Sequence, residues 1–322
     1  MRIHALVAAG AALALGLTAC GSAGTSSAGT SSASSAGAAS GGDVKIGMSI
    51  STLNNPYFVQ LRAGAEAEAK KLGVTLTVTD AQNDASQQVN QVQNFTSQSM
   101  KAIIINPVDS DAAAPAVKIA ERSSIPVIAV DRGVNGGKVA QTVASDNVAG
   151  GKLAAEQLAK EIGEKGEVVV LQGVPGTSAS RDRGQGFTEG IKAFPGIKVV
   201  AQQPADFDRA KGLDVMTNLL QSHPGVTGVF AENDEMALGA LKALGAKAGK
   251  DVKVVGFDGT PDGLKAIEAG TLAASIAQQP ALLGQQSVQN AVKAVKSEQL
   301  QATANVPVKV ATKDNLSEFT GA

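Results

Sequence analysis

Short apolar runs rich in β-branched residues alternate with longer amphipathic stretches from Asp43 onward. An amphipathic stretch of helical type covers residues 57–73, and further helices are predicted to begin near Ala85 and Asp109. The strand-type runs of the first half are "VKIGMSI" (44–50), "VTLTVTD" (74–80), "KAIIINP" (101–107) and "IPVIAVD" (125–131). Continuous apolar strands that alternate with helices are typical of βαβ units, so the pattern predicts an α/β fold with parallel sheets covered on both faces.

The same rhythm repeats in the second half of the chain. Residues 147–173 have the helix-then-strand plan of residues 55–80. Further strand-type runs cover residues 197–205, 226–234, 252–258, 273–279 and 306–312. Eight to eleven strands are many for one small sheet, and a chain of 322 residues suits about two domains. The pattern therefore predicts two similar doubly wound lobes.

Polar residues follow the carboxyl ends of the predicted strands again and again. They stand in "STLNNPYF" from Ser51, "DAQND" from Asp80, "NPVDSD" from Asn106, "DRG" from Asp131, "GVPGTSASRDRG" from Gly173, "ADFDR" from Ala205, "ENDE" from Glu232 and "DGTPDG" from Asp258. Ligands of open parallel sheets bind in the crevice beyond these ends. Two facing lobes would therefore form a cleft that both sets of loops line.

The residue types at these ends indicate the chemistry of the ligand. Carboxylates and amides accept from and donate to hydroxyls, and arginine donates several hydrogen bonds in a fixed fork. The chain has one Tyr, eight Phe and no Trp, and three of these nine aromatic residues, Tyr57, Phe58 and Phe207, stand at strand ends. Aromatic faces suit the C–H faces of a sugar ring. A small polyhydroxylated ligand fits this set better than a phosphate or a metal ion.

Each candidate also has a purely structural interpretation. Asp131 and Arg132 could form a surface ion pair worth less than about 1 kcal/mol. Tyr57 and Phe58 could simply begin a helix and pack beneath it. The remaining alternatives are Ser180 as a helix cap, one residue of 233–235 as another cap, Asp258 as a turn residue, and His223 as the end of a helix without a chemical role.

The composition excludes several classes of function. A net charge of −1, from 28 basic and 29 acidic residues, argues against binding to nucleic acid. A single Cys and two His leave no disulfide framework, no Cys-based metal site and no His-based triad. The chain also lacks a GxxxxGK[ST] phosphate loop. We therefore expect no cofactor and no metal.

The N-terminal residues have the composition of a targeting segment. Residues 5–17 are an apolar run of signal-peptide length, followed by "LTAC" (17–20), which resembles a lipobox. Residues 21–42 contain only Gly, Ser, Ala and Thr, which cannot bury enough apolar surface to fold. We expect a signal peptide at 1–19 and, at 20–42, a lipidated Cys20 with a flexible linker, so that the protein is exported and anchored to the cell membrane. An ordinary secretory signal is the alternative.

A series of longer motifs resembles the bacterial ribose-binding proteins, the soluble receptors of ABC importers in the pentose and hexose group of periplasmic binding proteins. The resemblance runs through essentially all of residues 43–322. The motifs, in order, are "STLNNPYF", "INPVDSDA", "IPVIAVDR", "ASDNVAGGK", "LQGVPGTSASRDRG", "QPADFDRAKGLDVM", "FAENDEMALGAL", "VVGFDGTPDG" and "IAQQP".

The resemblance implies the type I periplasmic binding protein fold, with two Rossmann-like lobes joined by a hinge of three segments. The N-terminal lobe would comprise residues 43–145 and 279–307, and the C-terminal lobe 146–278 and 308–322. The hinge segments would fall near 145–147, 278–280 and 307–309.

The resemblance also implies a binding site. Arg183 is carried over in preference to Arg181. Tyr57 stands where the ribose-binding family member has Phe, and its added hydroxyl either points to solvent or alters access or epimer preference. The implied ligand-binding residues are Ser51, Asn55, Tyr57, Phe58, Asp131, Arg132, Arg183, Phe207, Asn233, Asp258 and Gln278.

The function implied by the resemblance is capture of D-ribose by closing lobes and delivery to an ABC transporter permease. A chemoreceptor is a further partner that the resemblance allows, and we expect a monomer that is not an enzyme. Alternatives are another pentose, allose or a quorum-signal furanose as the ligand. A repressor of the same superfamily would carry an N-terminal DNA-binding domain in place of the signal and linker, and an exported glycosidase would need a working carboxylate pair.

Overall fold

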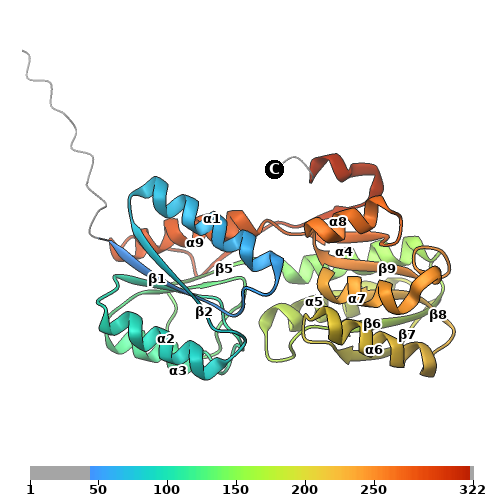
Figure 1. Cartoon of the computed structure of the whole chain (residues 1–322), viewed down its shortest axis with the longest axis horizontal. Coiled ribbons are helices and arrows are strands. Elements are labelled where there is room, and N and C mark those ends of the chain that lie inside the picture. Colours follow the sequence, from blue (N-terminus) through green and yellow to red (C-terminus); the bar gives the residue numbers. More distant parts are fainter. Residues whose placement is uncertain (1–43, 320–322) are drawn as a thin grey trace, which may run out of the picture. The chain divides into compact units, whose positions relative to one another are not determined.

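A computed structural model describes residues 44–319 of the chain. The predicted signal peptide, Cys20 and the linker lie outside this range. The described strands form two sheets with helices packed against them (Figure 1). Each sheet has six strands, in the orders β11-β5-β4-β3-β1-β2 and β12-β10-β9-β8-β6-β7. Neighbouring strands are parallel, except that β12 runs antiparallel to β10. The predicted α/β fold with two mostly parallel sheets is confirmed.

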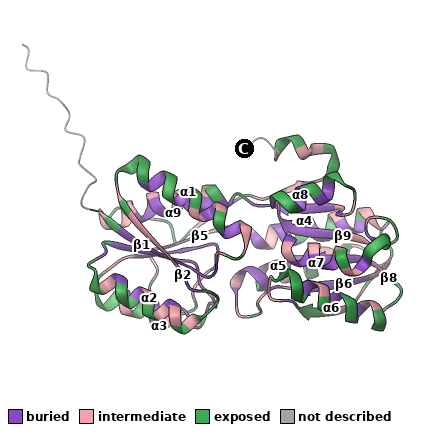
Figure 2. Cartoon of the chain, in the orientation of Figure 1, coloured by how far each residue is buried: buried purple, intermediate pink, exposed green. Residues whose placement is uncertain are grey.

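The first sheet lies between two pairs of helices. Helices α1 (Pro56–Leu72) and α9 (Pro280–Val295) cover one face, and α2 (Ala85–Ser97) and α3 (Ala114–Arg122) cover the other. Its central strands are almost fully buried, because helices cover both faces (Figure 2). The strands are β1 (Lys45–Ile50), β2 (Thr75–Asp80), β3 (Ala102–Ile105), β4 (Val127–Val130), β5 (Gln141–Ser145) and β11 (Thr303–Val306).

The second sheet has the same plan. Val168 and Val170 of β6 (Gly166–Gln172) belong to the apolar cluster beneath α4 (Asn147–Glu161) and α5 (Ser178–Gly190), and Val169 and Leu171 belong to the cluster on the opposite face. That face is covered by α6 (Arg209–Ser222), α7 (Asp234–Leu244) and α8 (Pro261–Glu268). The other strands are β7 (Ile197–Pro204), β8 (Val226–Ala231), β9 (Lys253–Asp258), β10 (Ala274–Ala277) and β12 (Lys309–Ala311), and short 3₁₀ helices cover Ile191–Ala193, Gly245–Lys247 and Lys313–Glu318.

The chain passes between the two sheets three times. The crossings lie between β5 and α4, between β10 and α9, and between β11 and β12. Helix α4 packs on β8, β9 and β10, whereas α9 packs on β3, β4 and β5 although it comes late in the sequence. Each crossing is only one or two residues long, so the sheets are closely tied at these points.

Some predicted elements differ from the structure. The helix expected near Asp109 begins at Ala114, because the Asp109 carboxylate accepts from the N–H groups of Asp111 and Ala112 and so forms a turn first. The edge strand β11 and its neighbour β5 were not predicted, since "TANV" and "QTVAS" carry few apolar residues. His223 caps the C-terminal end of α6, as predicted. No helix between residues 44 and 319 has the length and apolar character that spanning a membrane requires.

Candidate functional site

Loops from both sheets line a small polar pocket with about 240 Å³ of empty space, part of which is open to solvent. All the predicted site residues except Ser51 and Gln278 line it, and Ala179 lines it without having been predicted. The lining residues are Asn55, Tyr57, Phe58, Asp131, Arg132, Ala179, Arg183, Phe207, Asn233 and Asp258. Asp131, Asn233 and Asp258 stand at the carboxyl ends of β4, β8 and β9, where polar groups of parallel sheets are expected to gather.

The side chains of Asp131 and Arg132 both face the pocket. Asp131 follows β4 directly and has a left-handed backbone with a φ of 67°. Arg132 Nε lies 3.6 Å from the Asp131 carboxylate. Asp131 is 3% exposed and Arg132 5%, so their interpretation as a surface ion pair is wrong.

The Arg132 guanidinium is held in place by a backbone carbonyl and two aromatic rings. Its Nη1 donates to the Pro107 carbonyl at 2.9 Å, and its carbon lies 5.2 Å and 5.4 Å from the ring centroids of Phe58 and Phe207. Burial lowers the pKa of Arg132, and the neighbouring Asp131 charge opposes this shift. Its buried Nε makes no hydrogen bond. A buried donor without a hydrogen bond is costly, and the Asp131 carboxylate 3.6 Å away offsets part of this cost.

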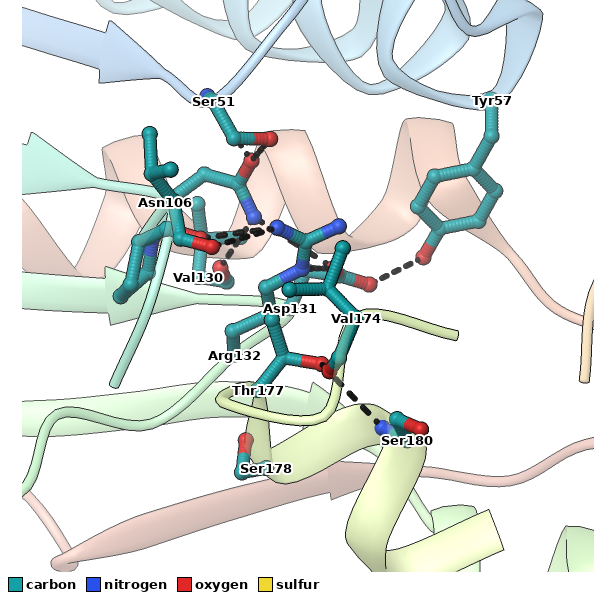
Figure 3. A network of polar contacts seen from close by, with 12 residues as sticks. Ser51, Tyr57, Asn106, Val130, Asp131, Arg132, Val174, Thr177, Ser178 and Ser180 are labelled. Atoms are coloured by element: carbon teal, nitrogen blue, oxygen red, sulfur yellow. Dashed lines mark hydrogen bonds and ion pairs between the residues drawn. The ribbon is translucent and has the colours of Figure 1, made fainter. Parts of the chain in front are cut away.

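Tyr57 places its hydroxyl between the two halves of the site. The hydroxyl donates to Asp131 Oδ1 at 2.8 Å (Figure 3). It also lies 3.1 Å from Gln278 Oε1. The side chain is 3% exposed, so the expectation that the hydroxyl points to solvent is wrong. It turns inward because Asn55 caps α1 by accepting from the Tyr57 N–H, which fixes the first helical turn at the pocket. Burial, with the charges of Asp131 and Asp258, raises the pKa of Tyr57 well above its usual value, so the phenol stays protonated.

Ser51 does not line the pocket, and its hydroxyl contacts Asn106 behind it. Its hydroxyl donates to Asn106 Oδ1 at 2.7 Å, and Asn106 Nδ2 donates to the Val130 carbonyl at 3.1 Å (Figure 3). The same Nδ2 lies 3.4 Å from Asp131 Oδ2. Ser51 therefore orients Asn106, and Asn106 supports the Asp131 carboxylate. Asn106 was missed as a site residue, although it follows β3 in the polar segment "NPVDSD".

Arg183 is the buried cation of the second sheet. Its Nε donates to Asn147 Oδ1 at 2.8 Å, and its Nη1 donates to the Glu232 carbonyl at 2.6 Å. Its guanidinium lies 3.9 Å from the centroid of the Phe257 ring. Arg183 is 3% exposed, whereas Arg181 faces outward. Asn147 was not predicted, and its place in "ASDNVAGGK" after β5 is the signal that could have found it.

A close helix contact sets the position of Arg183. At Gly151 of α4, an added Cβ would lie 2.2 Å from the Arg183 carbonyl oxygen, so only glycine lets α4 and α5 approach this closely. Helix α5 begins at Ser178 with Thr177 as its cap. The interpretation of Ser180 as the cap is therefore wrong.

Asp258 is the second buried carboxylate of the pocket. Gln278 Nε2 donates to its Oδ1 at 2.7 Å, and Arg183 Nη1 lies 3.6 Å from the same oxygen. Burial raises the pKa of Asp258 well above its usual value, and Arg183 acts in the opposite direction. Gln278 thus links Asp258 to the Tyr57 hydroxyl from behind the pocket. Asp258 is 4% exposed, so it is more than a turn residue.

Asn233 and Phe207 complete the second-sheet side. Asn233 Oδ1 caps α7 by accepting from the Met236 N–H, and its Nδ2 donates to the Phe207 carbonyl. The prediction that one residue of 233–235 is a cap is confirmed. Phe207 has a φ of 59° and Asp258 a φ of 120°. Like Asp131, both residues therefore have a positive φ, which costs a non-glycine residue about 1–3 kcal/mol.

Hydrogen bonds also join the loops of the two sheets beside the pocket. The Gly133 N–H donates to Ser178 Oγ at 2.8 Å, and the Ser178 N–H donates to Ser110 Oγ at 3.1 Å. The Ser110 N–H donates to the Gly176 carbonyl at 3.0 Å. The two sheets are therefore held together by direct contacts as well as by the three crossings. Within residues 44–319, no group of three or more His, Cys, Asp or Glu could hold a metal ion.

Comparison with known proteins relates this fold and pocket to a family. The chain is 52% identical over 268 residues to the ribose import binding protein RbsB of Escherichia coli (strain K12), which covers 83% of this chain and 90% of that protein. It is 36% identical over 260 residues to the D-allose-binding periplasmic protein of the same organism, covering 77% of this chain and 83% of that protein.

A solved structure has the same fold. The Caulobacter myo-inositol-binding protein, bound to myo-inositol, matches with a TM-score of 0.82 and 35% identity, covering 86% of this chain and 96% of that chain. Residues 46–299 match the family described as the periplasmic binding protein domain. The chain therefore belongs to the periplasmic binding protein family.

Proposed function

We propose that this protein is the solute-binding component of an ABC importer and that it captures D-ribose, or a monosaccharide of similar size, in the pocket between its two sheets. The family consists of solute-binding proteins, and the relative at 52% identity is named for ribose import. The observation that carries the proposal is a small buried pocket in which two carboxylates and two guanidiniums stand between aromatic rings.

The charge of the pocket favours a neutral ligand. Asp131 and Asp258 oppose Arg132 and Arg183, so the four charged groups sum to zero when the carboxylates are ionised. An ionic ligand would leave one buried charge uncompensated, which is costly. A sugar offers hydroxyls that donate to the carboxylates and accept from the guanidiniums without changing this balance.

Strong but reversible binding follows from these contacts. A hydrogen bond to a charged group contributes about 1.5–3 kcal/mol, so a few of them reach submicromolar affinity. An epimer that misplaces one hydroxyl leaves a buried carboxylate or guanidinium unpaired, and a site of this kind rejects such a ligand strongly. Nothing in this function requires a reaction, so ground-state contacts are sufficient.

The proposal includes the eleven predicted site residues and a division into lobes. In the site, Ser51 and Gln278 act from behind the pocket by orienting Asn106 and Asp258. The proposed lobes are residues 43–145 with 279–307, and residues 146–278 with 308–322. Rotation about the three crossings would open and close the pocket, and the closed form would dock on the permease and, where one exists, on a chemoreceptor.

A panel of sugars tests the ligand. The chain has a single tyrosine, Tyr57, and no tryptophan, so its tyrosine fluorescence reports directly on the pocket. We expect D-ribose to change this fluorescence at micromolar concentration and to raise the melting temperature more than allose, arabinose or xylose do. An unchanged melting temperature with millimolar ribose, together with a shift caused by another sugar of the panel, would assign the site to that sugar instead.

We also propose that Cys20 carries a lipid anchor after removal of residues 1–19. The lipobox-like "LTAC" and the polar linker that follows support this. Expression in a bacterium fed with a labelled fatty acid should label the wild-type protein in the membrane fraction but not Cys20→Ser. Equal labelling of both proteins would contradict the anchor.

A further inference from the structure

Glu232 is a buried acidic residue that stands behind the pocket and has no part in the proposed ligand contacts. It follows β8 and is 0% exposed. Its Oε2 accepts from the Gly173 N–H at 2.7 Å and from the Ser180 hydroxyl at 2.5 Å, whereas its buried Oε1 makes no hydrogen bond. One carboxylate oxygen therefore collects both donors and the other has none.

The groups that Glu232 holds lead to two residues of the pocket. Arg183 stands one helical turn after Ser180 in α5, and its Nη1 donates to the Glu232 carbonyl at 2.6 Å. Phe207 packs its ring directly on Gly173, where an added Cβ would lie 2.0 Å from the ring. Glu232 thus fixes the start of α5 and the loop after β6, and these two segments position Arg183 and Phe207.

The charges around Glu232 come from three elements. Arg183 of α5 favours the ionised Glu232 carboxylate. The other two contacts are uncharged donors, which are Ser180 of α5 and Gly173 of the loop after β6. The carboxylate of Asp234 in α7 accepts hydrogen bonds from the Thr260 N–H and the Ser275 hydroxyl. From β9, Asp258 lies on the far side of Arg183, 3.6 Å from its Nη1.

We infer that ionised Glu232 is a positioning residue for Arg183 and Phe207, and that its protonation loosens the pocket and weakens sugar binding. The inference rests on the proposed function. In the neutral form, a proton on Oε1 has no acceptor, and a proton on Oε2 meets the Ser180 hydroxyl and the Gly173 N–H that now donate there. The first placement leaves a buried O–H donor unpaired and the second displaces one of the two donors, so both carry a cost that the ionised form avoids.

The expected size of the effect follows from the fraction of ionised protein. Burial raises the pKa of Glu232 to about 7, even though the Gly173 and Ser180 donors and Arg183 oppose the shift. About a tenth of the molecules is then ionised at pH 6 and about nine tenths at pH 8. Because the apparent affinity scales with the competent fraction, ribose should bind about tenfold more weakly at pH 6 than at pH 8.

The test is the ribose dissociation constant of the full chain, measured by calorimetry between pH 6 and pH 8.5. Wild type should lose about tenfold in affinity toward pH 6, whereas Glu232→Gln should show a clearly shallower profile because its amide does not titrate. Glu189→Gln, which alters an exposed glutamate of α5 paired with Lys152, should behave as wild type. A flat wild-type profile, or a Glu232→Gln profile as steep as that of wild type, would overturn the inference.

A second variant keeps the test decisive if Glu232→Gln does not fold. Ser180→Ala removes one donor to the ionised carboxylate, so the pKa of Glu232 should rise and the midpoint of the affinity profile should move to higher pH. A merely structural role would lower affinity at every pH without moving the midpoint, and that outcome would overturn the inference. Failure of wild type to bind ribose or any other sugar of the panel at any pH would overturn the proposed function and this inference with it, whereas binding with no dependence on Glu232 would overturn the inference alone.

Discussion

Asp131 and Arg132 show how two neighbouring residues can serve one pocket. In a continuing strand, consecutive side chains point to opposite faces, so one of the pair would turn away. The left-handed backbone of Asp131 ends the alternation at the point where β4 ends, and its N–H donates to the Val143 carbonyl of the adjacent strand. Both charges therefore face the same small volume.

Sequence patterns predicted most of the residues that line the pocket but few of those that support it. Polar residues after strands are visible in the chain, and the family motifs select among them. Asn106, Asn147 and Glu232 act through contacts with residues at least 25 positions away, and no local pattern encodes such pairs. The direction of the Tyr57 hydroxyl was missed for the same reason, since Asp131 and Gln278 meet it only in the folded chain.

The Tyr57 hydroxyl occupies an acceptor that a ligand hydroxyl would also use. Tyr57→Phe should leave Asp131 Oδ1 unpaired in the ligand-free protein and lower the free energy of unfolding by about 1–3 kcal/mol. Ribose should recover part of this loss, because one of its hydroxyls can donate to the same oxygen. Calorimetric unfolding with and without ribose measures both quantities.

A hydroxyl elsewhere in the first sheet provides the matched control. Thr79→Val removes a hydroxyl that lies 3.0 Å from Gln91 Oε1 and does not line the pocket. It should lower the stability equally with and without ribose. If Tyr57→Phe behaved in the same way, its hydroxyl would not compete with the ligand.

At the scale of elements, the central strands and long helices were predictable because burial on both faces makes strands continuously apolar. Strands such as β3 and β4 are fully buried and carry this signal, whereas β5 alternates between buried and half-buried positions. Short edge strands lack the signal, and their pairing with a neighbour decides their conformation. Strand β12 adds an antiparallel edge to a parallel sheet, which is common in large α/β sheets.

Contacts between helices determine where the residues of the site lie. Helix α5 bears Ala179 and Arg183, and its distance from α4 is set by glycines at the contact, of which Gly151 is one. The sequence shows these glycines, but it does not show that they face another helix backbone. The position of a pocket residue therefore depends on packing that becomes visible only in three dimensions.

At the scale of the molecule, the repeated pattern predicted two sheets, and the three crossings explain why each sheet takes strands or helices from distant parts of the sequence. The contacts between the loops of the two sheets could not be predicted from the sequence. Ser110 and Ser178 make these contacts through backbone groups and hydroxyls, and serine in a loop is too common to indicate a partner. These contacts hold the loops of the two sheets against each other in the described residues.

Removing both hydroxyls should shift the molecule toward an open state. Ser110→Ala with Ser178→Ala deletes the acceptors for the N–H groups of Ser178 and Gly133, at about 1 kcal/mol each. The ligand-free double variant should have a larger radius of gyration in X-ray scattering, and its ribose affinity should fall by about 5- to 30-fold. Saturating ribose should restore the compact form, because ligand binding favours closure.

Ser222→Ala, whose hydroxyl bonds only within α6, should match wild type in both measurements. A double variant as compact as wild type without ribose would show that the three crossings alone fix the arrangement of the two sheets, and closure would then need no contribution from these loops.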